Sequence, residues 1–285
     1  MHTTNLPSYP SFVAMTPKDR SDILARIEKI SQMGDSQKWL INFDEMEIDS
    51  VPFASGSNSS VHKCKWRGTN IVVKKPKIKK IKILEDLLRE IEIWSTLRHP
   101  NLVQFLGASI KLEHDDFYIL MEKIPGRELG KIIEGTLHNH QKKTICSQLI
   151  EAITFLHHCK PPVIFRDLKP DNILIDDHMG LKLTDFGLSR YVPTDSQYIM
   201  TGNTGTTRYM APEVYLNQVY DLRADVYSLG MIFYYIYTQK LPFSGYNLDT
   251  IDTYFRQPDL LFSTSLVRNK QFRSIVNNCI EKNKE

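Results

Sequence analysis

The spacing of apolar residues changes near residue 125, and this change limits the folds that the chain can adopt. Before it, short runs rich in β-branched residues begin at Ile41, Ser59 and Asn70, each bounded by turn residues, as in a meander of strands. After it, apolar residues recur at helical spacing over 144–158 and again from Asp225. The pattern predicts an α+β fold with a β-rich first half and a mainly helical second half. The expected divisions are an N-terminal extension over 1–40, a first lobe over 41–124 and a second lobe over 125–285.

Two helices are expected before residue 100. Thr16 resembles an N-cap ahead of Pro17, and isoleucines and leucines follow at helical spacing, which predicts one amphipathic helix in the extension. We expect this helix to pack on the first lobe; the alternative is a partner-binding motif. The second helix is expected over 83–97, and it ends before Pro100 because proline blocks continuation.

Charge and composition exclude several classes of function. A formal net charge of +3 over 285 residues does not call for a nucleic-acid partner. The lysine-rich run over 74–82 could serve nuclear import or an anionic partner, but a solvated loop is favoured. The four cysteines lack metal-ligand spacing and are expected to be reduced thiols. The longest apolar run, over 226–237, is too short for the roughly twenty residues of a membrane span and predicts a buried helix. Because no signal sequence is apparent, we expect a cytoplasmic protein without membrane insertion.

The segment 163–174, VIFRDLKPDNIL, places charged residues between two apolar ends. Taken alone, such a run is most simply a solvated turn between two short strands. Other segments supply complementary groups: Lys74 ends a strand, and Asp185 follows another. Phosphoryl transfer needs cations held against the phosphates and a carboxylate that receives the hydroxyl proton, while carboxylate and amide oxygens hold magnesium. Asp167 and Asn172 complete that set.

Five motifs in order resemble those of eukaryotic protein kinases, closest to the tyrosine-kinase-like serine/threonine group. IVVK ends at Lys74, LREIEIW contains Glu90, FRDLKPDN is the catalytic loop, DFG begins at Asp185, and APE ends at Glu213. The resemblance runs from about residue 45 to the end of the chain. It implies a bilobal protein kinase fold and a serine/threonine kinase that uses ATP and Mg²⁺ and acts on protein substrates.

The resemblance also implies roles for individual residues. Asp167 would be the catalytic base, and Lys169 would contact the transferred phosphate and marks a serine/threonine type of loop. Lys74 would bind phosphate with Glu90 as its partner. Asn172 and Asp185 would bind Mg²⁺. The residues implied in ATP binding are Ala54, Gly56, Val61, Val72, Lys74, Met121, Glu122, Ile124 and Leu174.

Phe165 stands where the family usually has histidine. A hydrogen bond from the imidazole to the backbone is therefore lost, worth about 1 kcal/mol. The aromatic ring would still stack in a column with Trp94, Phe105 and Phe186.

Two other positions depart from the family pattern. The glycine-rich loop ASGSNSSV keeps only Gly56 of three glycines, which restricts the loop and favours weaker ATP binding. Val72 replaces a small alanine over the adenine, and a slight shift of its strand is the expected response. The eroded loop leaves a pseudokinase scaffold with weak nucleotide binding as the alternative function, although the complete polar set favours catalysis. A small-molecule kinase is disfavoured by GTTRYMAPE over 205–213, which resembles a protein-substrate platform.

Two expectations concern regulation and the end of the chain. Arg166 and Arg190 are expected to be unpaired and to receive a phosphate on the activation loop. The candidate hydroxyls are those of Thr194, Ser196, Tyr198, Thr201 and Thr204. The sequence stops at Glu285, where the family continues with an arginine that pairs with the APE glutamate. We therefore expect a truncated chain in which Glu213 lacks its partner and an apolar face is open to a partner protein.

Overall fold

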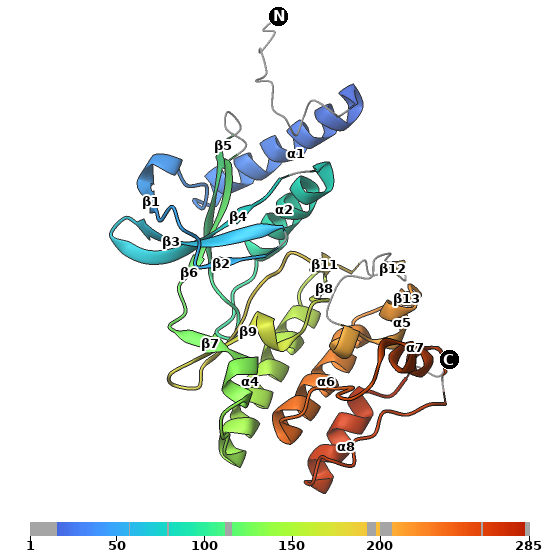
Figure 1. The fold of residues 1–285 in the computed structure, drawn as a ribbon. Helices are drawn as coiled ribbons and strands as arrows, with labels where there is room; N and C mark the ends of the chain where they lie inside the picture. Colours follow the sequence, from blue (N-terminus) through green and yellow to red (C-terminus); the bar gives the residue numbers. More distant parts are fainter. Residues whose placement is uncertain are drawn as a thin grey trace, which may run out of the picture. The chain divides into compact units, whose positions relative to one another are not determined.

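A computed structural model describes residues 16–56, 58–78, 80–111, 116–192, 198–199, 207–257 and 259–282. The chain divides into two units (Figure 1): unit 1 comprises Met1–Arg98 and Val103–Lys123, and unit 2 comprises His99–Leu102 and Ile124–Glu285. The N-terminal extension therefore belongs to unit 1.

Unit 1 is built on an antiparallel sheet of six strands. The strands pair in the order β1 (Met46–Ile48), β3 (Ser59–Trp66), β4 (Thr69–Pro76), β6 (Asp116–Glu122) and β5 (Phe105–Lys111), and β2 (Ala54–Ser55) pairs with β3. Alternate side chains point to opposite faces, so Ile71, Val73 and Leu120 join one apolar cluster on one face of the sheet. The strands predicted at Ser59 and Asn70 are confirmed.

The alternating segment that begins at Ile41 is only partly a strand. Asn42 Oδ1 accepts a hydrogen bond of 3.2 Å from the backbone N–H of Asp44, and this caps the 3-10 turn η1 (Phe43–Glu45). Asparagine side chains compete for backbone donors in this way. The prediction of a longer strand there is wrong, because β1 begins only at Met46.

Both helices predicted before residue 100 are present in unit 1. Helix α1 (Pro17–Ser36) begins after Thr16, whose Oγ1 accepts from the backbone N–H of Asp19, as its sequence predicts. Helix α2 (Ile81–Trp94) ends three residues before the predicted limit of 97. The N–H groups of Thr96 and Leu97 bond to carbonyls three residues back, so the last turn is tighter than an α-helix.

Unit 2 is mainly helical. Its longer helices are α4 (Asn139–His157), α6 (Arg223–Thr238), α7 (Leu248–Arg256) and α8 (Lys270–Cys279), with the short helices α3 (Leu129–Ile133) and α5 (Pro212–Tyr215). Helix α6 packs against α4 and α8, and every residue from Tyr227 to Ile236 is buried. The apolar run over 226–237 is therefore the predicted buried helix.

Short strands position the loops of unit 2. Strands β7 (Gly126–Glu128), β9 (Ile173–Asp176) and β10 (Leu181–Leu183) form one sheet, and β8 (Val163–Ile164) pairs with β11 (Arg190–Tyr191). A further pair joins β12 (Tyr198–Ile199) to β13 (Val219–Tyr220). The 3-10 turns are η3 (Pro170–Asn172) and η4 (Thr207–Tyr209).

Among the described residues, no helix is long and apolar enough to cross a bilayer. All four cysteines are free, as the sequence predicts.

Candidate functional site

Lys74 and Glu90 form a buried ion pair within unit 1. Lys74 Nζ lies 2.7 Å from Glu90 Oε1 and 3.0 Å from Oε2. Lys74 comes from β4 and Glu90 from α2, and the Glu90 side chain is only 4% exposed. A paired lysine in this position keeps its charge and a fixed direction, so it can hold an anionic group.

The sheet of unit 1 brings several predicted nucleotide-binding residues into neighbouring rows. Ala54 lies opposite Val61, and Val61 lies opposite Lys74. Val72 lies opposite Met121, and both are buried. The β pairing around Val72 is regular, so its methyl groups are accommodated without a break in the strand.

Three other predicted nucleotide-binding residues lie near the junctions of strands. The carboxylate of Glu122 accepts a hydrogen bond of 2.7 Å from the backbone N–H of Gln104, so this side chain has a structural partner. Ile124 lies in unit 2 before β7, and Leu174 lies in β9. Gly126 also resembles a hinge residue, but a Cβ there would lie 2.4 Å from the carbonyl oxygen of Ile175, so close packing already requires glycine.

The remaining glycine of the glycine-rich loop has no structural reason to be glycine. A Cβ on Gly56 would meet nothing closer than the Ser59 carbonyl oxygen at 3.9 Å. The space that a side chain would fill therefore stays open above the backbone. Such a position suits the close approach of a ligand to backbone amides.

Lys77 ties the tip of this loop to the end of β4, a contact that sequence reasoning missed. Its Nζ donates to Ser55 Oγ at 2.9 Å and to the Gly56 carbonyl oxygen at 2.8 Å. Its neighbour Lys75 pairs with Asp116 at 2.8 Å. The lysine run is thus not simply a solvated loop, because two of its members are bonded to the sheet and the loop.

The catalytic-loop candidates come together in unit 2. Lys169 Nζ donates to Asp167 Oδ2 at 2.8 Å, and Asn172 Nδ2 donates to the carbonyl oxygen and to Oδ2 of Asp167 at 2.8 and 2.9 Å. Burial raises the pKa of Asp167, and the charge of Asp185 raises it further, while Lys169 and Asn172 oppose the shift. Asp167 is therefore a more basic carboxylate than an exposed aspartate.

Asn172 and Asp185 supply suitable donors for a divalent cation. Both amide hydrogens of Asn172 are directed to Asp167, which leaves its oxygen for a cation. Asp185 is near enough to Asp167 for its charge to affect the pKa of that residue. Within the described part of the chain, no three His, Cys, Asp or Glu side chains gather as a metal site. The donor set fits an ion that keeps water and phosphate oxygens as further ligands, as Mg²⁺ does.

Asp225 anchors the backbone before Asp167, and sequence reasoning missed it. Its carboxylate accepts from the N–H groups of Phe165 and Arg166, both at 2.8 Å, and from His157 Nε2 at 2.9 Å. Asp225 is fully buried in the first turn of α6. These bonds hold the loop where Phe165 cannot supply an imidazole. An acidic residue beside a buried apolar run was the available signal, because buried carboxylates need donors.

The predicted aromatic column appears as one contact in each unit. Phe165 and Phe186 are fully buried in unit 2 and meet edge to face with centroids 5.4 Å apart. Trp94 and Phe105 meet in unit 1 at 6.0 Å. A continuous column of all four rings stays a prediction.

The expectation of unpaired guanidiniums at Arg166 and Arg190 is wrong. The Arg166 guanidinium lies 6.0 Å from the ring centroid of Tyr220 and hydrogen-bonds with that side chain. Arg190 Nη1 donates to the carbonyl oxygen of Ser189 at 2.8 Å. Local carbonyls and an aromatic ring thus satisfy the two charges. The candidate hydroxyls Thr194, Ser196, Thr201 and Thr204 lie outside the described residues, as does the side chain of Tyr198.

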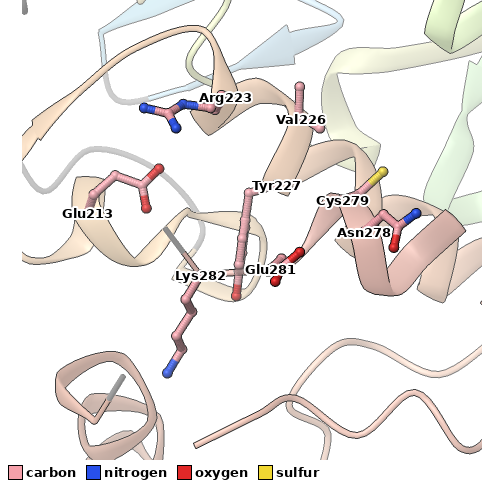
Figure 2. A pocket seen from close by; sticks show the side chains of 8 residues that line it. All are labelled: Glu213, Arg223, Val226, Tyr227, Asn278, Cys279, Glu281 and Lys282. Carbon is pink, nitrogen blue, oxygen red and sulfur yellow. The ribbon is translucent and has the colours of Figure 1, made fainter. Parts of the chain in front are cut away.

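Glu213 borders a pocket of about 310 Å³ in unit 2 (Figure 2). Burial raises the pKa of its carboxyl group, and within the described part of the chain no other residue hydrogen-bonds or ion-pairs with it. Arg223 is bound to Asp221 at 2.9 Å. The ammonium of Lys282 is directed away from Glu213 and donates to the carbonyl oxygen of Gln257 at 2.6 Å. The lining is Glu213, Arg223, Val226, Tyr227, Asn278, Cys279, Glu281 and Lys282, so this part of the face is largely polar and not the apolar face expected.

Comparison with known proteins places the chain in a family. The model of the protein kinase domain matches residues 52–285. A putative serine/threonine-protein kinase/receptor of Acanthamoeba polyphaga mimivirus is 36% identical over 214 residues, which cover 73% of this chain and 13% of that protein. The serine/threonine-protein kinase VIK of Arabidopsis thaliana is 34% identical over 221 residues, which cover 73% of this chain and 50% of that protein.

A third relative, the probable serine/threonine-protein kinase drkA of Dictyostelium discoideum, is 34% identical over 210 residues, covering 72% of this chain and 32% of that protein. The chain belongs to the protein kinase family. The predicted bilobal kinase fold is thereby confirmed. The matched segments span half or less of the length of these three relatives.

Proposed function

We propose that this chain is an ATP-dependent serine/threonine protein kinase that transfers the γ-phosphoryl group of ATP to protein hydroxyls. The observation that carries the proposal is the buried Asp167 carboxylate, held by Lys169 and Asn172. The relatives named as serine/threonine-protein kinases support the same reaction and acceptor. The tyrosine-kinase-like group is a further proposal, which rests on the sequence motifs.

Asp167 would orient the acceptor hydroxyl and receive its proton. Its raised pKa makes it a stronger proton acceptor than an exposed aspartate while it remains ionised near neutral pH. Lys169, 2.8 Å from Asp167 Oδ2, would stabilise negative charge on the transferred group. Positioning and electrostatic stabilisation are the main contributions of a protein to phosphoryl transfer.

Lys74 would bind phosphate oxygens of ATP, with Glu90 fixing its direction through bonds of 2.7 and 3.0 Å. The open space at Gly56 supports close approach of the phosphates to the loop backbone. Ala54, Val61, Val72, Met121, Glu122, Ile124 and Leu174 would line the nucleotide site.

Asn172 and Asp185 would hold Mg²⁺ through the Asn172 oxygen and the Asp185 carboxylate. When bound, the ion would neutralise phosphate charge. The proposal is supported by the hard oxygen donors and by the two Asn172 hydrogen bonds that fix its amide.

Location and further partners are less directly supported. Four free cysteines agree with a cytoplasmic location. A protein partner that covers the face near Glu213 is supported by the pocket there and by the buried carboxyl group. Exposed apolar side chains near the end of the described chain, such as Leu266 and Ile275, suit the same partner.

A kinase assay with ATP, Mg²⁺ and a generic protein substrate tests the proposed reaction. Asp167→Ala is expected to lower kcat at least about a hundredfold, because general-base and charge contributions are lost. Asp177→Ala removes an exposed aspartate near the same loop and serves as the control. Phosphate on serine or threonine is the expected product. Equal activity of the wild type and Asp167→Ala would contradict the proposal, as would phosphotyrosine as the main product.

A further inference from the structure

Helix α1 lies along α2 and contacts both α2 and β5 (Figure 1). Its buried residues are Ile23, Ile27, Ile30 and Gly34. This spacing of three and four residues forms a single stripe on one face of the helix. The other face is exposed, so α1 is bound to unit 1 along this stripe.

Glu92 links α2 directly to α1. Its carboxylate lies 3.4 Å from Arg26 Nη2 and 3.5 Å from Lys29 Nζ. Glu90 is two residues earlier on α2, and side chains two apart on an α-helix point about 200° away from each other. Glu90 therefore binds the sheet through Lys74, while Glu92 binds α1 on nearly the opposite side of α2.

A chain of aromatic rings makes a second link. Trp39, just after α1, meets Phe105 of β5 edge to face at 5.5 Å, and Phe105 meets Trp94 at the end of α2 at 6.0 Å. A Cβ on Gly34 would lie 2.8 Å from the Trp39 ring, so α1 packs tightly on this indole. The Trp39 carbonyl oxygen accepts from the backbone N–H of Ala108 at 3.0 Å, which fixes the indole to β5.

Helix α2 has weak local support at its own start. Lys80 is its N-cap and makes no side-chain cap bond, and the first turn contains no acidic residue. Lys82 in that turn also places a positive charge at the positive end of the helix dipole. The position of α2 must therefore depend on what packs against it.

We propose that α1 is a positioning element that holds α2 where Glu90 reaches Lys74. This inference rests on the proposed function, because it assigns the Lys74–Glu90 pair a part in catalysis. Release of α1 would free α2 to rotate or shift, and the ion pair would loosen. Ile27 and Glu92 are positioning residues in this sense, since they act through Glu90 and do not touch substrate.

The first test compares Ile27→Glu with Ala25→Glu in the full chain. Both substitutions add one carboxylate to α1, but Ile27 is 3% exposed and faces the unit, while Ala25 is exposed. We expect Ile27→Glu to increase hydrogen exchange over 81–94 and to lower kcat/KM about tenfold or more, a loss of about 1.4 kcal/mol in transition-state stabilisation. Ala25→Glu should behave as the wild type. Equal behaviour of the two variants would overturn the proposal.

A double-mutant cycle separates positioning from general destabilisation. In the Glu90→Gln background the ion pair is already lost, so Ile27→Glu should lower kcat/KM by much less than tenfold. A full multiplicative loss in that background would overturn the proposal.

Charge exchange decides the matter if Ile27→Glu fails to fold. Glu92→Arg alone, and Arg26→Glu with Lys29→Glu, should each increase exchange over 81–94 and lower kcat/KM. Their combination should restore both quantities toward the wild type, which a purely structural role of separate residues would not do. Absence of any effect of the reversals, or of restoration, would count against the proposal. Because hydrogen exchange needs no turnover, the α1 contact is tested even if the chain proves inactive and the proposed function fails.

Discussion

Replacement of Asp225 by asparagine should destabilise unit 2 and displace the catalytic loop. The carboxylate accepts three N–H donors: two reach Oδ2, from Phe165 and His157, and one reaches Oδ1, from Arg166. An asparagine can accept at only one of these two positions, and its NH₂ group would face donors at the other. It should keep its oxygen toward Phe165 and His157, so that the Arg166 N–H loses its acceptor.

The magnitude follows from this geometry. A hydrogen bond to a charged acceptor contributes about 1.5 to 3 kcal/mol, and a buried donor left without an acceptor costs about 1 to 3 kcal/mol. These terms overlap, so we expect Asp225→Asn to lower the free energy of unfolding by about 2 to 4 kcal/mol. Asp225→Ala removes all three acceptor contacts and should cost about 3 to 5 kcal/mol. A domain of this kind has only about 5 to 15 kcal/mol in total.

Urea denaturation of unit 2, followed by an unfolding probe such as fluorescence or circular dichroism, measures these changes. Asp177→Asn alters an exposed aspartate and should stay within about 0.5 kcal/mol of the wild type. Kinetics should show a loss in kcat for Asp225→Asn at temperatures where the protein is still folded, because the displaced backbone leads directly into Asp167. A free energy of unfolding for Asp225→Asn equal to that of the Asp177→Asn control would refute the reasoning.

Three further predictions concern the loop, the base and the thiols. Lys77→Met should raise KM for ATP severalfold with little change in kcat, because the bonds to Ser55 and Gly56 are lost; an unchanged KM would show that the loop needs no tie. Burial raises the pKa of Asp167 above its unfolded value, so its ionisation reduces stability as pH rises through the folded pKa. Asp167→Asn should therefore melt higher than the wild type at pH 7, and the difference should vanish near pH 3 to 4, below the unfolded pKa of about 3.9; a constant difference would contradict this. Burial raises the pKa of Cys64 to about 11, so a thiol reagent at pH 7.5 should label it slowly in the native protein and rapidly in urea; rapid native labelling would contradict the burial.

The residues that chemistry requires could be recognised in the sequence because their signals are local. Asp167, Lys169 and Asn172 lie within six residues of one another, and Thr16 and Pro17 mark the start of α1 directly. Strand β3 also has the predicted bounds, because alternation and flanking turn residues are properties of the strand itself. The partnership of Lys74 with Glu90 followed from the resemblance to the kinase family, which already contains tertiary information.

Contacts between distant segments were decided only by the tertiary structure. Asp225 is 60 residues from Phe165 in the sequence, and nothing near Asp225 indicates which donors it will meet. Lys77 looked like one more solvated lysine until its contacts with a loop 21 and 22 residues earlier were seen. Arg166 was expected to be unpaired because Tyr220, its neighbour in space, is far along the chain. A buried charge or a long cationic side chain takes whichever donor or acceptor the packed chain brings to it, and local sequence does not specify that partner.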